Sequence, residues 1–270
     1  MLGDYHIHTE FSTDSEASPE DHIQKALFLG MKEICFTDHV DLDYPPDEKG
    51  NPMFKLDADA YYDRISELRE KYRGLLKIKI GIELGLAPDY LAQNKAFAKV
   101  KPWDFIIGSV HQLDGEDPYY PEYWQGRDPK EIIQDYYELC LKNITDDNDY
   151  DVFGHMDYIR RYVPDRSFVY VEKDYYDITD MLLRHLIATG RGMELNTKGL
   201  HKGVTHFIPT ISLLQRYRDL GGELVTIGSD AHDSDSLGYS FRIAADILEN
   251  VGYRYIASYE GRVASFTPIR

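Results

Sequence analysis

The first segment of the sequence that could do chemistry is residues 4–8 (DYHIH), followed by Asp14. Alternate residues of a β-strand point to the same side, so a strand here would present His6 and His8 together. Two imidazoles and a nearby carboxylate are ligands that zinc, iron or manganese take in proteins. A His-x-His pair also occurs in ordinary strands, so a metal site requires further ligands from the rest of the chain.

Residues of the same types follow later apolar runs. They are Asp38 with His39, Glu83, His111, His155, and Asp230 with His232. So many candidate ligands exceed the needs of one ion and suit two or three divalent ions that share carboxylates. Because cysteine is absent from the set, a closed structural zinc site is disfavoured.

Each of these residues stands at the end of a predicted strand, and the strands alternate with predicted helices. The apolar pattern predicts strands at 4–8, 33–37, 76–82, 105–110, 151–154, 192–195 and 223–227. It predicts helices at 18–30, 57–73, from 88, and at 128–143, 172–189, 209–220 and 238–250, before a terminal strand or hairpin at 253–268.

Seven strand–helix units without a break in composition predict one α/β domain over residues 1–270. A barrel is favoured over an open doubly wound sheet, because no Gly-rich phosphate loop follows the first strand. The carboxyl ends of barrel strands meet on one face, where active sites lie. We therefore expect the histidines and acids to converge there.

The composition excludes some partners. A net charge of −17 argues against nucleic acid as the main partner, although bound cations would still allow a small phosphorylated substrate. Cys35 and Cys140 fall in apolar patterns and are predicted to be buried thiols. Neither a signal peptide nor an apolar run of membrane-spanning length is present, so we expect a cytoplasmic protein without a membrane partner. The oligomeric state is left open.

Taken together, the motifs resemble those of the polymerase and histidinol phosphatase (PHP) superfamily. They are residues 6–8 (HIH) with Asp14, 37–39 (TDH), Glu83, 108–111 (GSVH), 154–155 (GH) and 229–232 (SDAH). Segments 108–115, 157–161 and 194–200 further resemble its monofunctional histidinol-phosphate phosphatases. The resemblance implies a distorted (β/α)7 TIM-like barrel and metal-dependent hydrolysis of L-histidinol phosphate to L-histidinol and phosphate, in histidine biosynthesis.

The resemblance also implies a ligand set for two or three zinc, iron or manganese ions. One ion would be bound by His6, His8, Glu83 and Asp230, a second by Glu83, His111 and His155, and a third by Asp14, His39 and His232. Several relatives have histidine where this chain has Asp14. A hydroxide between the first two ions would attack phosphorus in line.

The groups around the metals are less defined. Asp38 is expected either to orient a ligand histidine or to protonate the leaving alkoxide. Arg160 or Arg161 could grip two phosphate oxygens, with Arg160 preferred and a surface salt bridge the alternative for the second.

Three residues beyond the sixth strand form a basic cluster: Lys198, His201 and Lys202. Lys198 or His201 is expected to touch substrate, with a solvated loop as the alternative. The aromatic residues of segment 112–127 are expected to form either a lid or an ordinary packed loop. His22, His185 and His206 are interpreted as structural. No residue is identified for the substrate's ammonium group.

Three other functions are alternatives to histidinol-phosphate hydrolysis. A PHP-type phosphoesterase for another small phosphate ester, a nucleotide or a cyclic phosphodiester is the nearest alternative. An amidohydrolase would usually need a bridging lysine after the fourth strand, where this chain has His111. A metal-binding or sensor module without catalysis is disfavoured because the ligand set is intact.

Overall fold

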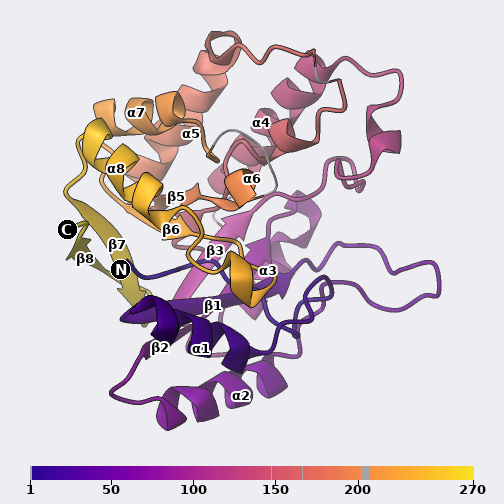
Figure 1. The fold of residues 1–270 in the computed structure, drawn as a ribbon. Helices are drawn as coiled ribbons and strands as arrows, with labels where there is room; N and C mark the ends of the chain where they lie inside the picture. The colour runs from indigo at the N-terminus through magenta and orange to yellow at the C-terminus, as the bar shows by residue number, and fades with distance from the viewer. Residues whose placement is uncertain (1, 147, 166, 202–206) are drawn as a thin grey trace.

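A curved parallel β-sheet forms the centre of the computed structural model, which describes residues 2–146, 148–165, 167–201 and 207–270 (Figure 1). Its six strands are neighbours in sequence order and all pair in parallel. They are β1 (Glu33–Val40), β2 (Lys77–Gly85), β3 (Phe105–Ser109), β4 (Val152–Phe153), β5 (Gly192–Asn196) and β6 (Val225–Gly228). The strands are buried along nearly their whole length, which is why they read as continuous apolar runs.

Segment 4–8 closes this sheet into a barrel. The backbone N–H of Tyr5 donates to the carbonyl of Ile227 in β6 (3.0 Å), and the N–H of Cys35 in β1 donates to the carbonyl of Asp4 (2.8 Å). The segment therefore lies between the first and last strands as a seventh parallel member. The predicted distorted (β/α)7 TIM-like barrel is confirmed.

Segment 4–8 is less regular than the predicted strand. It forms only isolated parallel bridges, at Asp4 with Ile34 and at Ile7 with Ala231. One reason is that the N–H of Ile7 donates to the side-chain oxygen of Thr37 (3.0 Å) instead of a strand carbonyl.

Helices surround the barrel near the predicted positions. They are α1 (Pro19–Leu29), α2 (Ala58–Lys71), α3 (Leu91–Phe97), α4 (Pro129–Thr145), α5 (Tyr176–Ala188), α6 (Lys198–His201), α7 (Ile211–Asp219) and α8 (Phe241–Val251). The first begins where the Ser18 hydroxyl accepts a hydrogen bond from the Asp21 N–H, and it ends at Gly30, whose φ of 72° suits glycine.

Five short 3₁₀ helices lie in the described ranges: η1 (Pro88–Tyr90), η2 (Pro121–Trp124), η3 (Tyr158–Tyr162), η4 (Glu172–Tyr175) and η5 (Ser234–Ser236). The turns η1 and η4 form the beginnings of the helices predicted from 88 and 172, whereas η2, η3 and η5 were not predicted. The helix α6 is only four residues long. Elements of this length carry too few residues for a periodic apolar pattern. Both η3 and α6 follow barrel strands at the carboxyl face.

The predicted terminal hairpin is present as β7 (Tyr255–Glu260) and β8 (Val263–Pro268). Its residues Ala257 and Tyr259 pack with Tyr5, Cys35 and Phe105 in a buried cluster beside the barrel strands. Both cysteines of the chain are buried free thiols, as predicted. No helix in the described ranges combines the length and apolar character needed to cross a bilayer.

Candidate metal centre

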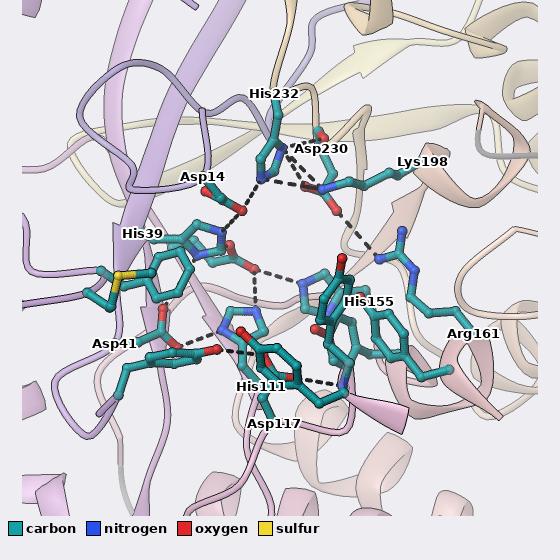
Figure 2. A pocket seen from close by; sticks show the side chains of 18 of the residues that line it. Asp14, His39, Asp41, His111, Asp117, His155, Arg161, Lys198, Asp230 and His232 are labelled. Carbon is teal, nitrogen blue, oxygen red and sulfur yellow. Dashed lines mark hydrogen bonds and ion pairs between the residues drawn. The ribbon is translucent and has the colours of Figure 1, made fainter. Parts of the chain in front are cut away.

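The predicted metal ligands converge at the carboxyl ends of the barrel strands (Figure 2). Most fall into groups whose potential ligand atoms lie within 4.8 Å of one another. The groups are His8/His39/His232, His6/His8/Glu83, His6/His155/Asp230 and His39/Glu83/His111. Residues up to 224 positions apart in the chain therefore meet because each follows, or ends, a parallel strand.

Glu83 lies at the centre of this cluster. Its Oε1 accepts a hydrogen bond from Ser109 Oγ (2.7 Å) and lies 2.8 Å from His155 Nε2. Its Oε2 lies 3.3 Å from His6 Nε2 and 3.0 Å from His39 Nδ1, yet it is buried without a hydrogen-bond partner. A buried carboxylate oxygen that faces imidazole nitrogens without hydrogen bonds is what a shared metal ligand requires.

The electrostatics of the cluster fit a cationic occupant. Burial alone would raise the pKa of Glu83, but the neighbouring His6, His111 and His39 hold it well below its usual value. Burial alone would lower the pKa of His6, but the Glu194 and Glu83 carboxylates raise it well above the usual range. The site thus stabilises positive charge between its carboxylates, and divalent cations would supply that charge.

Asp14 lies at the outer edge of the cluster. Its Oδ2 is 2.9 Å from His232 Nε2 and 3.9 Å from His39 Nε2. The neighbouring imidazoles lower the pKa of Asp14 although burial opposes this. The three residues that the sequence groups around a third ion are therefore together.

A second layer of carboxylates holds the imidazoles, and sequence reasoning did not identify it. Glu194 Oε1 lies 2.6 Å from His6 Nδ1, and Glu194 Oε2 accepts a hydrogen bond from the His155 N–H (2.8 Å). Asp41 Oδ1 lies 2.7 Å from His111 Nδ1. The available signal was an acid within or directly after a buried strand, since such acids are rarely buried unless they are paired.

Asp38 belongs to this supporting layer and does not line the cavity. Its carboxylate accepts hydrogen bonds from the Thr9 N–H (2.7 Å) and Ser12 Oγ (2.7 Å). Ser12 Oγ in turn lies 3.3 Å from His8 Nδ1. Of the two expected roles, this position favours orientation of a ligand histidine over protonation of a leaving group.

The structure places Arg161 in the cavity lining, whereas Arg160, the residue preferred from the sequence, is not part of that lining. Arg160 Nη1 donates to Asp157 Oδ2 (2.5 Å), and its guanidinium lies 3.9 Å from the ring centroid of Tyr170. Arg161 instead lines the cavity, with Nη1 4.0 Å from Asp230 Oδ2. Adjacent residues of the turn η3 point to different sides, and the sequence does not show which side faces the cavity.

Lys198 also lines the cavity. Its Nζ lies 2.8 Å from Asp230 Oδ1 and 3.1 Å from His232 Nδ1. The side chain of His201, and the residues Lys202 and His206, lie outside the described part of the structure. His22 is buried in α1, and its Nε2 lies 3.0 Å from the His8 carbonyl, in keeping with a structural role.

The cavity over the cluster has a volume of about 670 Å³. Segment 112–127 contributes Asp117, Tyr119 and Tyr120 to its lining. Tyr123 and Trp124 of the same segment are buried in the core instead. The segment therefore packs into the core at one end and contributes to the wall of the cavity at another.

Comparisons with known proteins give the same family as the motifs. Residues 4–198 match the model of the PHP domain. The chain is 31% identical to the histidinol-phosphatase of Lactococcus lactis subsp. lactis, over 96% of this chain and 94% of that protein. It is 32% identical to a probable histidinol-phosphatase of Clostridium acetobutylicum, over 93% of this chain and 94% of that protein.

A solved structure shares the whole fold. It is histidinol phosphate phosphatase from Lactococcus lactis subsp. lactis, complexed with zinc, L-histidinol and phosphate. The two chains superpose with a TM-score of 0.90 at 29% identity, covering 98% of this chain and all of the other. With the barrel, the converging ligands and the match over residues 4–198, this chain belongs to the PHP domain family.

Proposed function

We propose that this protein is a histidinol-phosphatase that hydrolyses the phosphomonoester L-histidinol phosphate to L-histidinol and phosphate. The observation that carries the proposal is the convergence of imidazoles and carboxylates at the floor of one cavity, beside Arg161 and Lys198. The full-length similarity to histidinol-phosphatases supports the choice of substrate.

The cluster fits two or three divalent ions of zinc, iron or manganese. His6, His8, Glu83 and Asp230 would hold one ion, Glu83, His111 and His155 a second, and Asp14, His39 and His232 a third. The buried Glu83 Oε2, which has no hydrogen-bond partner, supports this occupancy. When bound, such ions supply positive charge to phosphoryl oxygens and lower the pKa of water.

The chain's own groups prepare the site for a phosphate ester. Arg161 offers a planar pair of N–H donors that matches two phosphate oxygens, and Lys198 offers a compact positive charge. Glu194 and Asp41 hold the imidazoles of His6 and His111 so that these ligands need not reorganise. Glu83 and Asp230 are buried in the cavity floor, and their reduced contact with water strengthens their electrostatic interactions.

We further propose that the protein acts as a single domain in the cytoplasm, without a nucleic-acid partner. The net charge of −17 supports this, since a phosphate backbone requires a basic face. A small phosphorylated metabolite is the partner that the cavity volume suits.

The test is phosphate release from L-histidinol phosphate by the purified protein, before and after metal removal with a chelator. A panel of sugar phosphates, nucleotides and a phosphodiester is measured beside it. We expect fast release from L-histidinol phosphate, loss after chelation, recovery when zinc, manganese or iron is added back, and poor turnover of the panel.

Two results would contradict the proposal in different ways. Turnover of the panel without turnover of L-histidinol phosphate would retain the metal chemistry and reject the substrate. No turnover of any ester by metal-loaded protein would reject the enzyme and favour a metal-binding role.

A further inference from the structure

Two carboxylates that line the cavity lie outside the ligand set and its supporting layer, Asp117 and Asp233. Asp233 caps η5, where its Oδ1 accepts hydrogen bonds from the Ser236 N–H and Oγ (both 2.8 Å), so Asp117 is the remaining candidate for a substrate contact. Asp117 lines the cavity from segment 112–127, and no lysine, arginine or histidine nitrogen of the described chain lies within 4.0 Å of its carboxylate. Four other cavity carboxylates do have such partners: Asp14, Asp41, Glu83 and Asp230. Asp117 therefore has no direct ion-pair partner in the described chain, and the nearby cationic imidazole that acts on its carboxylate is His111, beyond ion-pair distance.

The Asp117 carboxylate is held in a fixed position. Its Oδ2 accepts a hydrogen bond from the Tyr44 hydroxyl (2.8 Å), and its Oδ1 accepts one from the Tyr119 N–H (2.8 Å). Each carboxylate oxygen has two lone-pair sites, so both can accept another donor. Burial raises the pKa of Asp117, which marks a desolvated anion that would gain from a cationic partner.

Two aromatic walls lead from the histidine cluster toward Asp117. On one side, the Phe54 ring is 5.1 Å from that of His39 and 4.6 Å from that of Tyr44, which donates to Asp117.

The second wall starts at the ligand His155. The Tyr158 ring is 4.9 Å from the His155 ring, and the Tyr162 ring is 4.9 Å from that of Tyr158. In Figure 2, Asp117 lies beside His111, at the opposite edge of the view from His232 and Lys198.

We propose that Asp117 binds the ammonium group of L-histidinol phosphate, while the imidazole of the substrate packs between the two tyrosine-bearing walls. The inference rests on the proposed function and assigns the part of the substrate that carries specificity. It makes Asp117 a specificity residue for phosphate esters that bear a neighbouring amine.

The chemistry of the substrate matches this arrangement. L-Histidinol phosphate has an anionic phosphate at one end, an ammonium group on the adjacent carbon and an imidazole beyond it. The cavity offers cationic groups near the ligand cluster, then a carboxylate without a direct ion-pair partner in the described chain, between aromatic surfaces. Aromatic faces bind flat rings, and a partly desolvated carboxylate binds an ammonium more strongly than one in water.

The experiment compares the wild type and Asp117→Asn, both loaded with metal, on three esters. These are L-histidinol phosphate, 3-(imidazol-4-yl)propyl phosphate without the amine, and L-phenylalaninol phosphate without the imidazole. We expect Asp117→Asn to lower kcat/KM by about ten- to a hundredfold for both amine-bearing esters, mainly through KM. For the ester without the amine, kcat/KM should change less than about twofold.

Matched variants separate specificity from folding. Asp114→Asn, on the same segment with its side chain exposed, should change none of the three values. Tyr44→Phe removes the hydroxyl that holds Asp117, and it should weaken the same two esters by a smaller factor. Metal content and the thermal midpoint, measured for every variant, should match the wild type.

Several results would overturn the assignment. An equal loss on all three esters would mean a general role, and a loss confined to the two imidazole esters would place the imidazole on Asp117. Unchanged kinetics of Asp117→Asn on L-histidinol phosphate would also reject it. Failure of the proposed function is a separate result, because the wild type itself would then not release phosphate from L-histidinol phosphate.

Discussion

The imidazoles of His6 and His111 are each bound on both sides. Their Nδ1 atoms lie 2.6 Å from Glu194 and 2.7 Å from Asp41, and their Nε2 atoms each lie 3.3 Å from Glu83. A carboxylate at Nδ1 fixes the tautomer that keeps the Nε2 lone pair free for a metal. The carboxylates of Glu194 and Asp41 therefore determine that His6 and His111 present Nε2 as the nitrogen that can bind a metal ion.

Replacing Glu194 by glutamine should weaken metal binding. The carboxylate accepts from both His6 and the His155 N–H, whereas an amide has only one oxygen to accept with. We expect Glu194→Gln to lower metal affinity by about ten- to a hundredfold, measured by competition with a chromophoric chelator. Glu67→Gln, on the exposed face of α2, is the control, and equal affinities for both variants would contradict the role of Glu194.

The two neighbouring arginines should respond differently to lysine. Arg161→Lys keeps the charge but loses the paired donors, so kcat/KM for L-histidinol phosphate should fall at least about tenfold. Arg160→Lys loses the contacts with Asp157 and Tyr170, so it should lower the free energy of unfolding by about 1–2 kcal/mol and leave kcat/KM within about twofold. Kinetics and denaturant melts of both variants test this, and the reverse pattern would restore Arg160 as the phosphate ligand.

The candidate metal ligands could be located from the sequence because their residue types recur at the ends of apolar runs. Their partners could not be located, because those depend on contacts between distant segments. Glu194 and His6 are 188 residues apart. The choice between Arg160 and Arg161 depended on the side-chain direction within one short turn, which no periodicity encodes.

At the scale of elements, glycines in the strands make room for the second layer. A Cβ on Gly228 of β6 would lie 2.3 Å from Glu194 Oε1 and 2.4 Å from the Cβ of His6. A Cβ on Gly85 of β2 would lie 2.1 Å from Asp41 Oδ1. Since real atoms do not approach so closely, these carboxylates reach the imidazoles only because both strands carry glycine there.

Gly228→Ala should therefore damage the metal centre, whereas Gly192→Ala should not. At Gly192, in β5, a Cβ would meet the Leu224 carbonyl and Val152 at 2.9 Å, away from the cluster. Both variants should lose about 1–3 kcal/mol of stability through overpacking. Only Gly228→Ala should also lose metal affinity and activity, measured by metal titration, and equal metal losses would contradict the spacing argument.

The long elements were predictable and the short ones were not. The helices α1, α2 and α4 begin within one residue of the predicted starts. Their N-caps are Ser18, Asp57 and Asp128, whose side chains accept hydrogen bonds from backbone N–H groups. The turns η3 and α6, which carry Arg161 and Lys198 into the cavity, have no apolar period to detect. The elements that frame the barrel could therefore be read from the sequence, while the elements that complete the cavity required the structure.

At the scale of the whole molecule, the two ends of the barrel differ in polarity. The β7–β8 hairpin packs against residues near the amino ends of the strands in an apolar cluster. The carboxyl ends carry a buried polar cluster whose groups hold one another's pKa values away from their usual range. Stability should therefore depend on pH more through buried histidines and acids than through the net charge.

This pH dependence of stability can be tested at His22, a buried histidine that is not a proposed metal ligand. It is buried in α1, donates through Nε2 to the His8 carbonyl, and has no partner at Nδ1. Burial lowers its pKa from 6.5 to about 4. Between these values the unfolded chain binds a proton that the folded protein does not, so stability falls as the pH decreases from about 6.5 to 4, by up to about 3 kcal/mol.

His22→Gln keeps an N–H donor at this place and removes the titration. Relative to the wild type, the variant should lose less stability between pH 7 and pH 4, and the two curves should converge or cross as acid is added. Urea melts of both proteins at each pH, under the same metal conditions, measure the difference, with His185→Gln on the partly exposed face of α5 as the control. The other acid-sensitive groups are common to both proteins, so a difference between the two curves comes from residue 22. Parallel curves would mean that His22 takes up its proton equally in the folded and unfolded states. That result would contradict the conclusion that burial keeps the His22 imidazole neutral.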